Sequence, residues 1–170
     1  MSATTYIGTG AVTSADFKNC KWVGTTKGGN AVTITLKDAI NMGNIEWTFA
    51  EKNDVVPAIE MTACYDNTDE ASSSTIEPWT VTIDGTVSAG ASEIILGAGK
   101  FYIEDTLVAL TRGGGSFNVE REYREINADG DRGTVKGRVV MEGSRAKLTM
   151  NVLTMLTKLT DLYTSIEASV

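Results

Sequence analysis

The sequence contains no histidine, two cysteines and two prolines among its 170 residues. The lack of histidine removes the commonest general base, the usual activator of a nucleophile and the usual metal ligand. Cys20 and Cys64 are widely spaced and belong to no metal-ligand motif, so neither a disulfide framework nor a thiolate metal site is expected. These shortages argue against an enzyme, and we predict a protein without a catalytic site or a cofactor.

The chain also lacks any apolar run near the roughly 20 residues that a membrane helix needs. Its first residues, MSATTYIGTG, have neither the basic nor the hydrophobic region of a signal peptide. The formal net charge of -7 argues against a nucleic-acid-binding surface, because duplex affinity comes largely from Lys and Arg that neutralise phosphates. We therefore expect a protein made in a cytoplasm, with no membrane partner and no specific affinity for DNA.

What the sequence does contain is apolar residues at every second position. This alternation predicts strands with one wetter face. It runs through residues 32–36, 45–49, 59–65, 79–83, 117–124 and 148–152. Seventeen glycines suit the many turns of such a chain, and an apolar fraction of 42% is ordinary for a globular protein. We predict a single mainly β domain over residues 1–170, built as a small β-barrel or sandwich.

One segment has a different spacing. Its apolar residues recur at intervals of three and four, which is typical of an amphipathic helix. They are Val152, Leu156, Leu159, Leu162 and Tyr163, with Lys158 and Asp161 on the other side. The spacing predicts one α-helix that flanks the sheet between Val152 and Tyr163.

Two glycine-rich stretches, TTKGG at 25–29 and TRGGG at 111–115, resemble phosphate-binding loops at first sight. Each lies between two β patterns rather than before a helix whose N-terminus could hold an anion. We therefore interpret both as turns or bulges.

The segment FNVEREYREI at 117–126 is followed, after a turn, by TVKGRVVM at 134–141, a pattern that predicts an extended hairpin. Its charged residues are expected to face each other across the hairpin: Glu120, Glu122 and Arg124 on one strand, Lys136 and Arg138 on the other. Exposed pairs contribute only about 0 to 1 kcal/mol each, so their main effect is on register. Two long, charged strands are also what a sheet would present if it continued into a neighbouring subunit.

The turn of this hairpin, Asp129 to Gly133, has a superficial likeness to a calcium loop. Counted from Asn127, the position that needs glycine is Arg132 and the position that needs a bidentate glutamate is Arg138. A β-turn is therefore favoured. The alternative is a ligand- or metal-binding β-sandwich module that uses this turn, at 127–133, together with the acidic loop at 66–77.

Several blocks of the sequence together resemble a known family. The blocks are TRGGGSFNVEREYREINADGDRGTVKGR at 111–138, AKLTMNVL at 146–153, TMLTKLTDLY at 154–163, ITLKDAINMGNIEWTFAEKNDVVPAIEMTACYDN at 34–67 and EPWTV at 77–81. They resemble the tail tube (major tail) proteins of long-tailed bacteriophages, which are related in fold to the type VI secretion tube protein. The resemblance covers about half of the chain.

The resemblance implies a small β-barrel or sandwich with one flanking helix, an extended hairpin and a structural role. Such a subunit assembles with itself into hexameric rings that stack as a hollow tube in the virion's tail. The tube contacts other tail proteins and lets DNA pass along its lumen without specific binding, which agrees with the negative net charge. By resemblance, Glu120, Glu122, Arg124, Lys136 and Arg138 form a hairpin wall at the lumen or an interface. A contact loop between subunits or rings would consist of Asp129, Gly130, Asp131, Arg132 and Gly133.

The order of these blocks departs from the family pattern. There, the block similar to residues 101–165 comes first and the block similar to residues 23–81 follows; here the order is reversed. The reversal indicates a circular permutation with a junction around residues 84–100. Such a rearrangement requires the original termini to lie close together, as they commonly do in compact domains.

Overall fold

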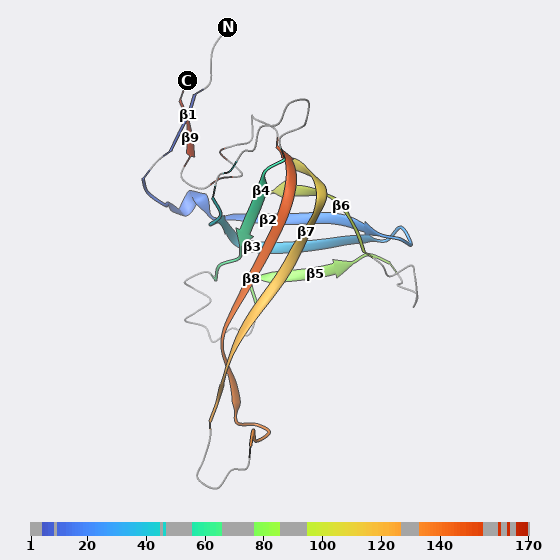
Figure 1. The fold of residues 1–170 in the computed structure, drawn as a ribbon, viewed down its shortest axis with the longest axis vertical. Coiled ribbons are helices and arrows are strands. Elements are labelled where there is room, and N and C mark those ends of the chain that lie inside the picture. The colour runs from blue at the N-terminus through green and yellow to red at the C-terminus, as the bar shows by residue number, and fades with distance from the viewer. Residues whose placement is uncertain are drawn as a thin grey trace.

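The computed structural model describes residues 5–8, 10–44, 46, 56–65, 77–85, 95–126, 133–154, 160, 163 and 166–169. The described chain is mainly β, which confirms the predicted fold class (Figure 1). Its elements are β1 (Thr5–Gly8), the 3-10 helix η1 (Ser14–Asp16), β2 (Lys18–Thr26), β3 (Ala31–Asn41), β4 (Ala58–Thr62), β5 (Trp79–Ile83), β6 (Ile95–Ile103), β7 (Thr106–Glu125), β8 (Val139–Thr154) and β9 (Ile166–Ser169).

The strands form a small barrel. The order in the main sheet is β2-β6-β7-β8-β4-β3-β5, and β2 also pairs with β3, so every strand of this sheet except β5 belongs to a closed ring. All of these pairings are antiparallel. The strand β5 is attached outside the ring, alongside residues 32–36 of β3. A separate two-stranded sheet pairs β1 with β9 and places Thr5 opposite Ser169.

The barrel core confirms the alternation in the sequence. Apolar side chains at every second position of β3, β4, β6 and β8 point inward, and burying one completely stabilises the fold by about 1.5 to 3 kcal/mol. The core includes Val32, Leu36, Ile59, Met61, Phe101, Ile103, Leu148, Met150 and Val152, each at most 4% exposed. The expected strand at 45–49 lies outside the described residues, apart from Glu46.

Trp22 on β2 packs over two glycines. Gly24 lies two residues after Trp22 on β2, and Gly99 on β6 is the cross-strand partner of Gly24. A Cβ added to Gly24 would lie 2.2 Å from Cη2 of Trp22, and one added to Gly99 would lie 2.4 Å from Nε1. The missing side chains therefore make the space in which the indole, 8% exposed, is buried.

The two glycine-rich stretches are a turn and a bulge, as the sequence predicts. Residues 25–29 close the β2–β3 hairpin, where the Thr26 amide donates to the Asn30 carbonyl at 2.8 Å and Gly29 has a φ of 89°. Residues 112–114 bulge out of β7. Gly113 and Gly114 adopt φ values of 84° and 90° there, a region that favours glycine.

Thr111 closes the gap that this bulge leaves in the ladder between β6 and β7. Its hydroxyl accepts a hydrogen bond from the Gly99 amide at 2.7 Å and donates one to the Gly99 carbonyl at 2.9 Å. A side chain thus replaces the backbone pairing that ends at Leu110.

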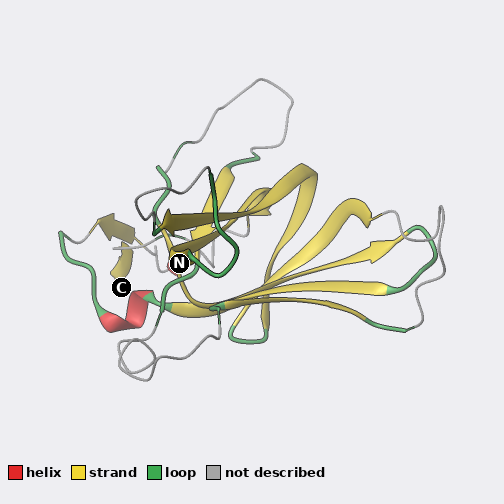
Figure 2. Cartoon of the chain, turned by 90° about the horizontal axis from the view of Figure 1, so that it is seen from below, coloured by secondary structure: helices red, strands yellow, loops and turns green. Residues whose placement is uncertain are grey.

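The prediction that a flanking helix begins at Val152 is wrong. Residues 152–154 continue β8, because Val152 extends the inward alternation of Leu148 and Met150 and pairs with Thr111 of β7. Thr160 is helical, while residues 155–159, 161 and 162 lie outside the described residues. In the part of the chain that the structure describes, the helical element with defined bounds is η1 (Figure 2).

Candidate assembly interface

The hairpin of β7 and β8 continues well beyond the barrel. We call its outer part, residues 120–126 and 133–145, the arm. Its strands pair with each other from Glu120 opposite Arg145 to Glu125 opposite Val139. The pairing of β6 with β7 ends at Leu110, and that of β4 with β8 ends at Lys147. Within the described ranges, the arm therefore has no strand beside it, and Figure 1 shows it projecting away from the barrel.

Contacts with the beginning of β5 hold the base of the arm. The Nη2 atom of Arg121 lies 3.1 Å from Oε1 of Glu77, and the rings of Trp79 and Phe117 meet edge to face with centroids 5.4 Å apart. Hydrogen bonds with Tyr123 and then with Glu77 raise the pKa of Arg121. Since an exposed ion pair adds little to stability, this pair mainly orients the arm.

A β-bulge lies in the middle of the arm. The register shifts between Glu122, which is opposite Gly143, and Tyr123, which is opposite Met141, so Glu142 is the extra residue. The Glu142 carboxylate forms an ion pair with Arg124 on the other strand. Bulges of this kind increase the local twist of a hairpin.

Large apolar side chains on the arm are exposed. Tyr123 and Met141 lie opposite each other on the face that continues from the barrel core, and Val139 follows on that face. The exposed fractions are 57% for Tyr123, 50% for Ile126, 43% for Val139, 42% for Val140 and 47% for Met141. This surface was not predicted from the sequence, although the apolar run of residues 139–141 beside a charged strand indicates it.

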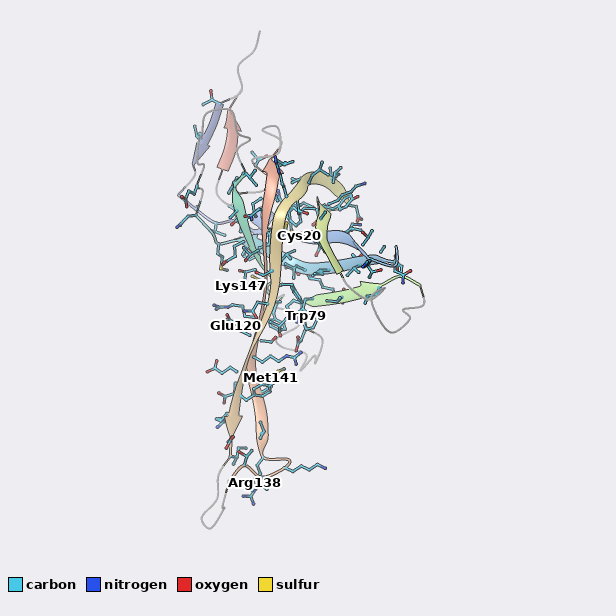
Figure 3. All side chains as sticks on the ribbon, turned by 45° about the vertical axis from the view of Figure 1, so that its right-hand side comes forward. Cys20, Trp79, Glu120, Arg138, Met141 and Lys147 are labelled. Carbon is cyan, nitrogen blue, oxygen red and sulfur yellow. The ribbon has the colours of Figure 1, made fainter. Side chains whose placement is uncertain are left out.

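The structure places the charged residues of the hairpin in a different register from the predicted one. Glu120 is opposite Arg145, Glu122 is opposite Gly143, and Arg124 is opposite Val140. Arg138 lies near the outer end of the arm instead, where its carbonyl accepts a hydrogen bond from the Ile126 amide at 2.8 Å (Figure 3). Lys136 lies in the turn two residues earlier, before β8 begins. The expectation that Glu120 and Glu122 face these two cations is therefore wrong.

The cause of the different register is in the barrel. Phe117 pairs with Leu148 and Val119 pairs with Ala146, all on the core face, and a shift by one residue would turn these side chains outward. Core packing therefore decides the register, and β8 begins only at Val139. Of the predicted contact loop, Asp129, Gly130, Asp131 and Arg132 lie outside the described residues, while Gly133 is exposed.

The described residues give little support for a metal-binding or catalytic site. They contain no group of three or more His, Cys, Asp or Glu side chains that could hold a metal ion. Burial raises the pKa of Cys20 to about 12 and also raises the pKa of Cys64. Most of the acidic loop at 66–77 lies outside the description, and its last residue, Glu77, is paired with Arg121.

An apolar cavity of about 240 Å³ lies where the barrel opens beside the β7 bulge. It is lined mainly by Trp22, Ile34, Phe117, Leu148 and Met150. Ligand sites of drug size usually occupy about 300 to 1,000 Å³ and carry a few convergent polar groups. Here the polar side chains in the lining are two hydroxyls, Thr111 and Ser116, so the cavity does not define a reaction site.

No protein-family model, curated protein or solved structure matches this chain. Among the described residues, no helix is both long and apolar enough to cross a membrane.

Proposed function

We propose that this protein is a structural subunit, not an enzyme, that assembles with itself into hexameric rings stacked as a hollow phage tail tube. The observation that carries this proposal is the arm, a paired hairpin that leaves the barrel and exposes large apolar side chains. The tube would belong to the tail of the virion, contact other tail proteins and conduct DNA. No cofactor is involved.

The arm would be more stable against a neighbouring copy than alone in water. An isolated two-stranded hairpin is at best marginally stable in water, because it has no packed face. Five large apolar side chains on this one are 42–57% exposed. Tyr123, Val139 and Met141 share one face, and burying the exposed half of each against a neighbour would contribute about 1 kcal/mol per side chain, or about 3 kcal/mol per copy. An interface between copies accounts for both the length and the composition of the arm.

The charges of the arm fit a selective interface. Acidic and basic residues alternate along residues 120–125 of β7, and like charges in a wrong register would repel a wrong partner. In the proposed tube, Glu120, Glu122, Arg124, Lys136 and Arg138 belong to the wall, and residues 129–133 form a contact between subunits or rings. The net charge of -7 supports passage of DNA, since a negative surface repels phosphates.

Negative-stain electron microscopy and sedimentation velocity, across a range of concentration and salt, test the proposal. The unmodified protein is expected to form rings or tubes. Tyr123→Ser combined with Met141→Ser should raise the concentration needed for assembly by at least about tenfold. The control is Met42→Ser, which removes a 62% exposed apolar side chain outside the arm and should assemble normally. A protein that stays monomeric under all conditions would refute the proposal.

A further inference from the structure

The strand β5 has an open edge without the usual protection. In the described part of the chain it pairs with β3 alone. Its sequence, WTVTI, contains no charge, no proline and no bulge, which are the devices that normally prevent an edge strand from pairing with another chain. Val81 and Ile83 are also 44% and 40% exposed. Such an edge is a template for an added strand.

The hydrogen-bond pattern identifies which backbone groups of β5 face outward. The Lys37 amide donates to the Pro78 carbonyl, and the Asp84 amide donates to the Ala31 carbonyl, both at 2.9 Å. Backbone N–H and C=O groups point alternately to the two edges of a strand, so those of the even-numbered residues of this segment point to β3. The amides and carbonyls of Trp79, Val81 and Ile83 therefore point to the open edge.

Among the described strands, a second edge without a partner lies at the beginning of β8. The Ile126 amide bonds to the Arg138 carbonyl, and Val140 is opposite Arg124, so the backbone groups of Val139 and Met141 point away from β7. Residues 139–141 carry no charge, and the segment ends at the bulge of Glu142. The other edge of the arm, on β7, is protected because residues 120–125 are almost all charged.

We propose that the open edge of β5 in one copy pairs with residues 139–141 of β8 in a second copy. This inference rests on the proposed function and names the strands that join neighbouring subunits. Within one chain the two edges cannot meet, since β5 leaves the base of the arm and runs away from it (Figure 1). Pairing between copies would place Val81 and Ile83 beside Val139 and Met141 on one apolar face.

The pairing predicts the symmetry of the assembly. The two edges are different surfaces of the same chain, so the interface is head to tail, and a pair of copies keeps one free β5 edge and one free β8 edge. Interfaces of this type produce closed rings or open filaments rather than isolated dimers. A ring is one of the two kinds of assembly that this interface allows.

Proline substitutions test the pairing, because proline removes a backbone amide and is tolerated at edge positions where that amide bonds nothing in the same chain. Val81→Pro removes an outward amide from β5, and Met141→Pro removes one from β8. Each variant alone should remain monomeric at concentrations at which the unmodified protein assembles. Val81→Thr keeps the amide and the branched shape, so it is the matched control and should assemble within about threefold of the unmodified concentration.

Mixing the two proline variants gives the decisive measurement. Each one retains the edge that the other has lost, so an equimolar mixture should form heterodimers and nothing larger in sedimentation velocity. A mixture that stays monomeric, or single variants that assemble normally, would overturn the pairing while leaving the proposed function intact. Failure of the unmodified protein to assemble would instead overturn the proposed function, and the pairing with it.

Circular dichroism of each variant establishes that it is folded. Should Val81→Pro not fold, Val81→Lys replaces it in both experiments, since a lysine on an edge strand blocks pairing without changing the backbone. Normal assembly of a folded Val81→Lys variant would also overturn the pairing.

Discussion

Replacing Gly99 with alanine should destabilise the barrel, because Trp22 occupies the space that the new methyl group needs. The added Cβ would lie 2.4 Å from Nε1 of the indole, well inside van der Waals contact. The indole already lies against the backbone of Gly24, where a built Cβ would be only 2.2 Å from Cη2, so the ring has little room to move toward β2. The substitution therefore forces either the indole or the β2–β6 ladder to shift.

The expected cost follows from two opposing effects. Overpacking in a well-packed core costs about 1 to 3 kcal/mol. Alanine also reduces the conformational freedom of the unfolded chain, which stabilises by about 0.4 to 1 kcal/mol. Together these ranges give a net loss of about 0 to 2.6 kcal/mol. Because the added Cβ would lie 2.4 Å from the indole, the upper half is expected, about 1.3 to 2.6 kcal/mol, or about 3 to 10 °C in melting temperature for a chain of this size.

Gly97→Ala on the same strand is the matched control. A Cβ there would meet nothing closer than the Cα of Gly114, at 3.8 Å, so the stability should be unchanged or slightly higher. Urea unfolding, followed by tryptophan fluorescence at a concentration where the protein is monomeric, measures both variants. Equal stability of the two would refute the idea that the indole is fixed over the glycines.

Three further predictions concern the arm, the cysteines and metal. Replacing both Lys136 and Arg138 with Glu, which reverses their charge, should leave the monomer folded but impair assembly. Circular dichroism checks the fold, and normal tubes would contradict the place of these residues in an interface. With its pKa raised to about 12, Cys20 should react with a thiol reagent at pH 8 about a thousandfold more slowly in the native protein than in urea, where the pKa returns to about 8.5. Dialysis against a chelator should leave the melting temperature unchanged, whereas a decrease would favour the metal-binding alternative, because a metal bound to the folded state must stabilise it.

The fold class could be predicted from the sequence because period-two alternation directly reflects the two faces of a strand. Val32 and Leu36, or Ile59 and Met61, are buried as this pattern requires. The helix prediction failed at Val152 because a spacing of four also fits a strand, where every even spacing returns to the same face. The pairing with β7, a tertiary feature, decides between the two.

The features of the candidate interface were harder to predict. Charges on a hairpin are compatible with several registers of its two strands. The observed register is selected by the pairing of Phe117 with Leu148, which depends on the packing of the whole barrel. Alternation in β5 indicated a buried face, yet Val81 and Ile83 are exposed, because among the described strands β5 pairs with β3 alone and lies outside the closed ring. Whether an alternating strand is covered depends on its neighbours in space, which local sequence does not contain.

The pairing of β1 with β9 has a practical consequence for labelling. Thr5 and Ser169 are directly opposite each other, on a ribbon at the far end of the molecule from the arm (Figure 1). Two halves of a split fluorescent reporter, one attached before residue 5 and the other after residue 169, would therefore be held at high effective concentration within each molecule. Their fluorescence would report the folding of a single subunit, at a position remote from the arm through which subunits are proposed to join.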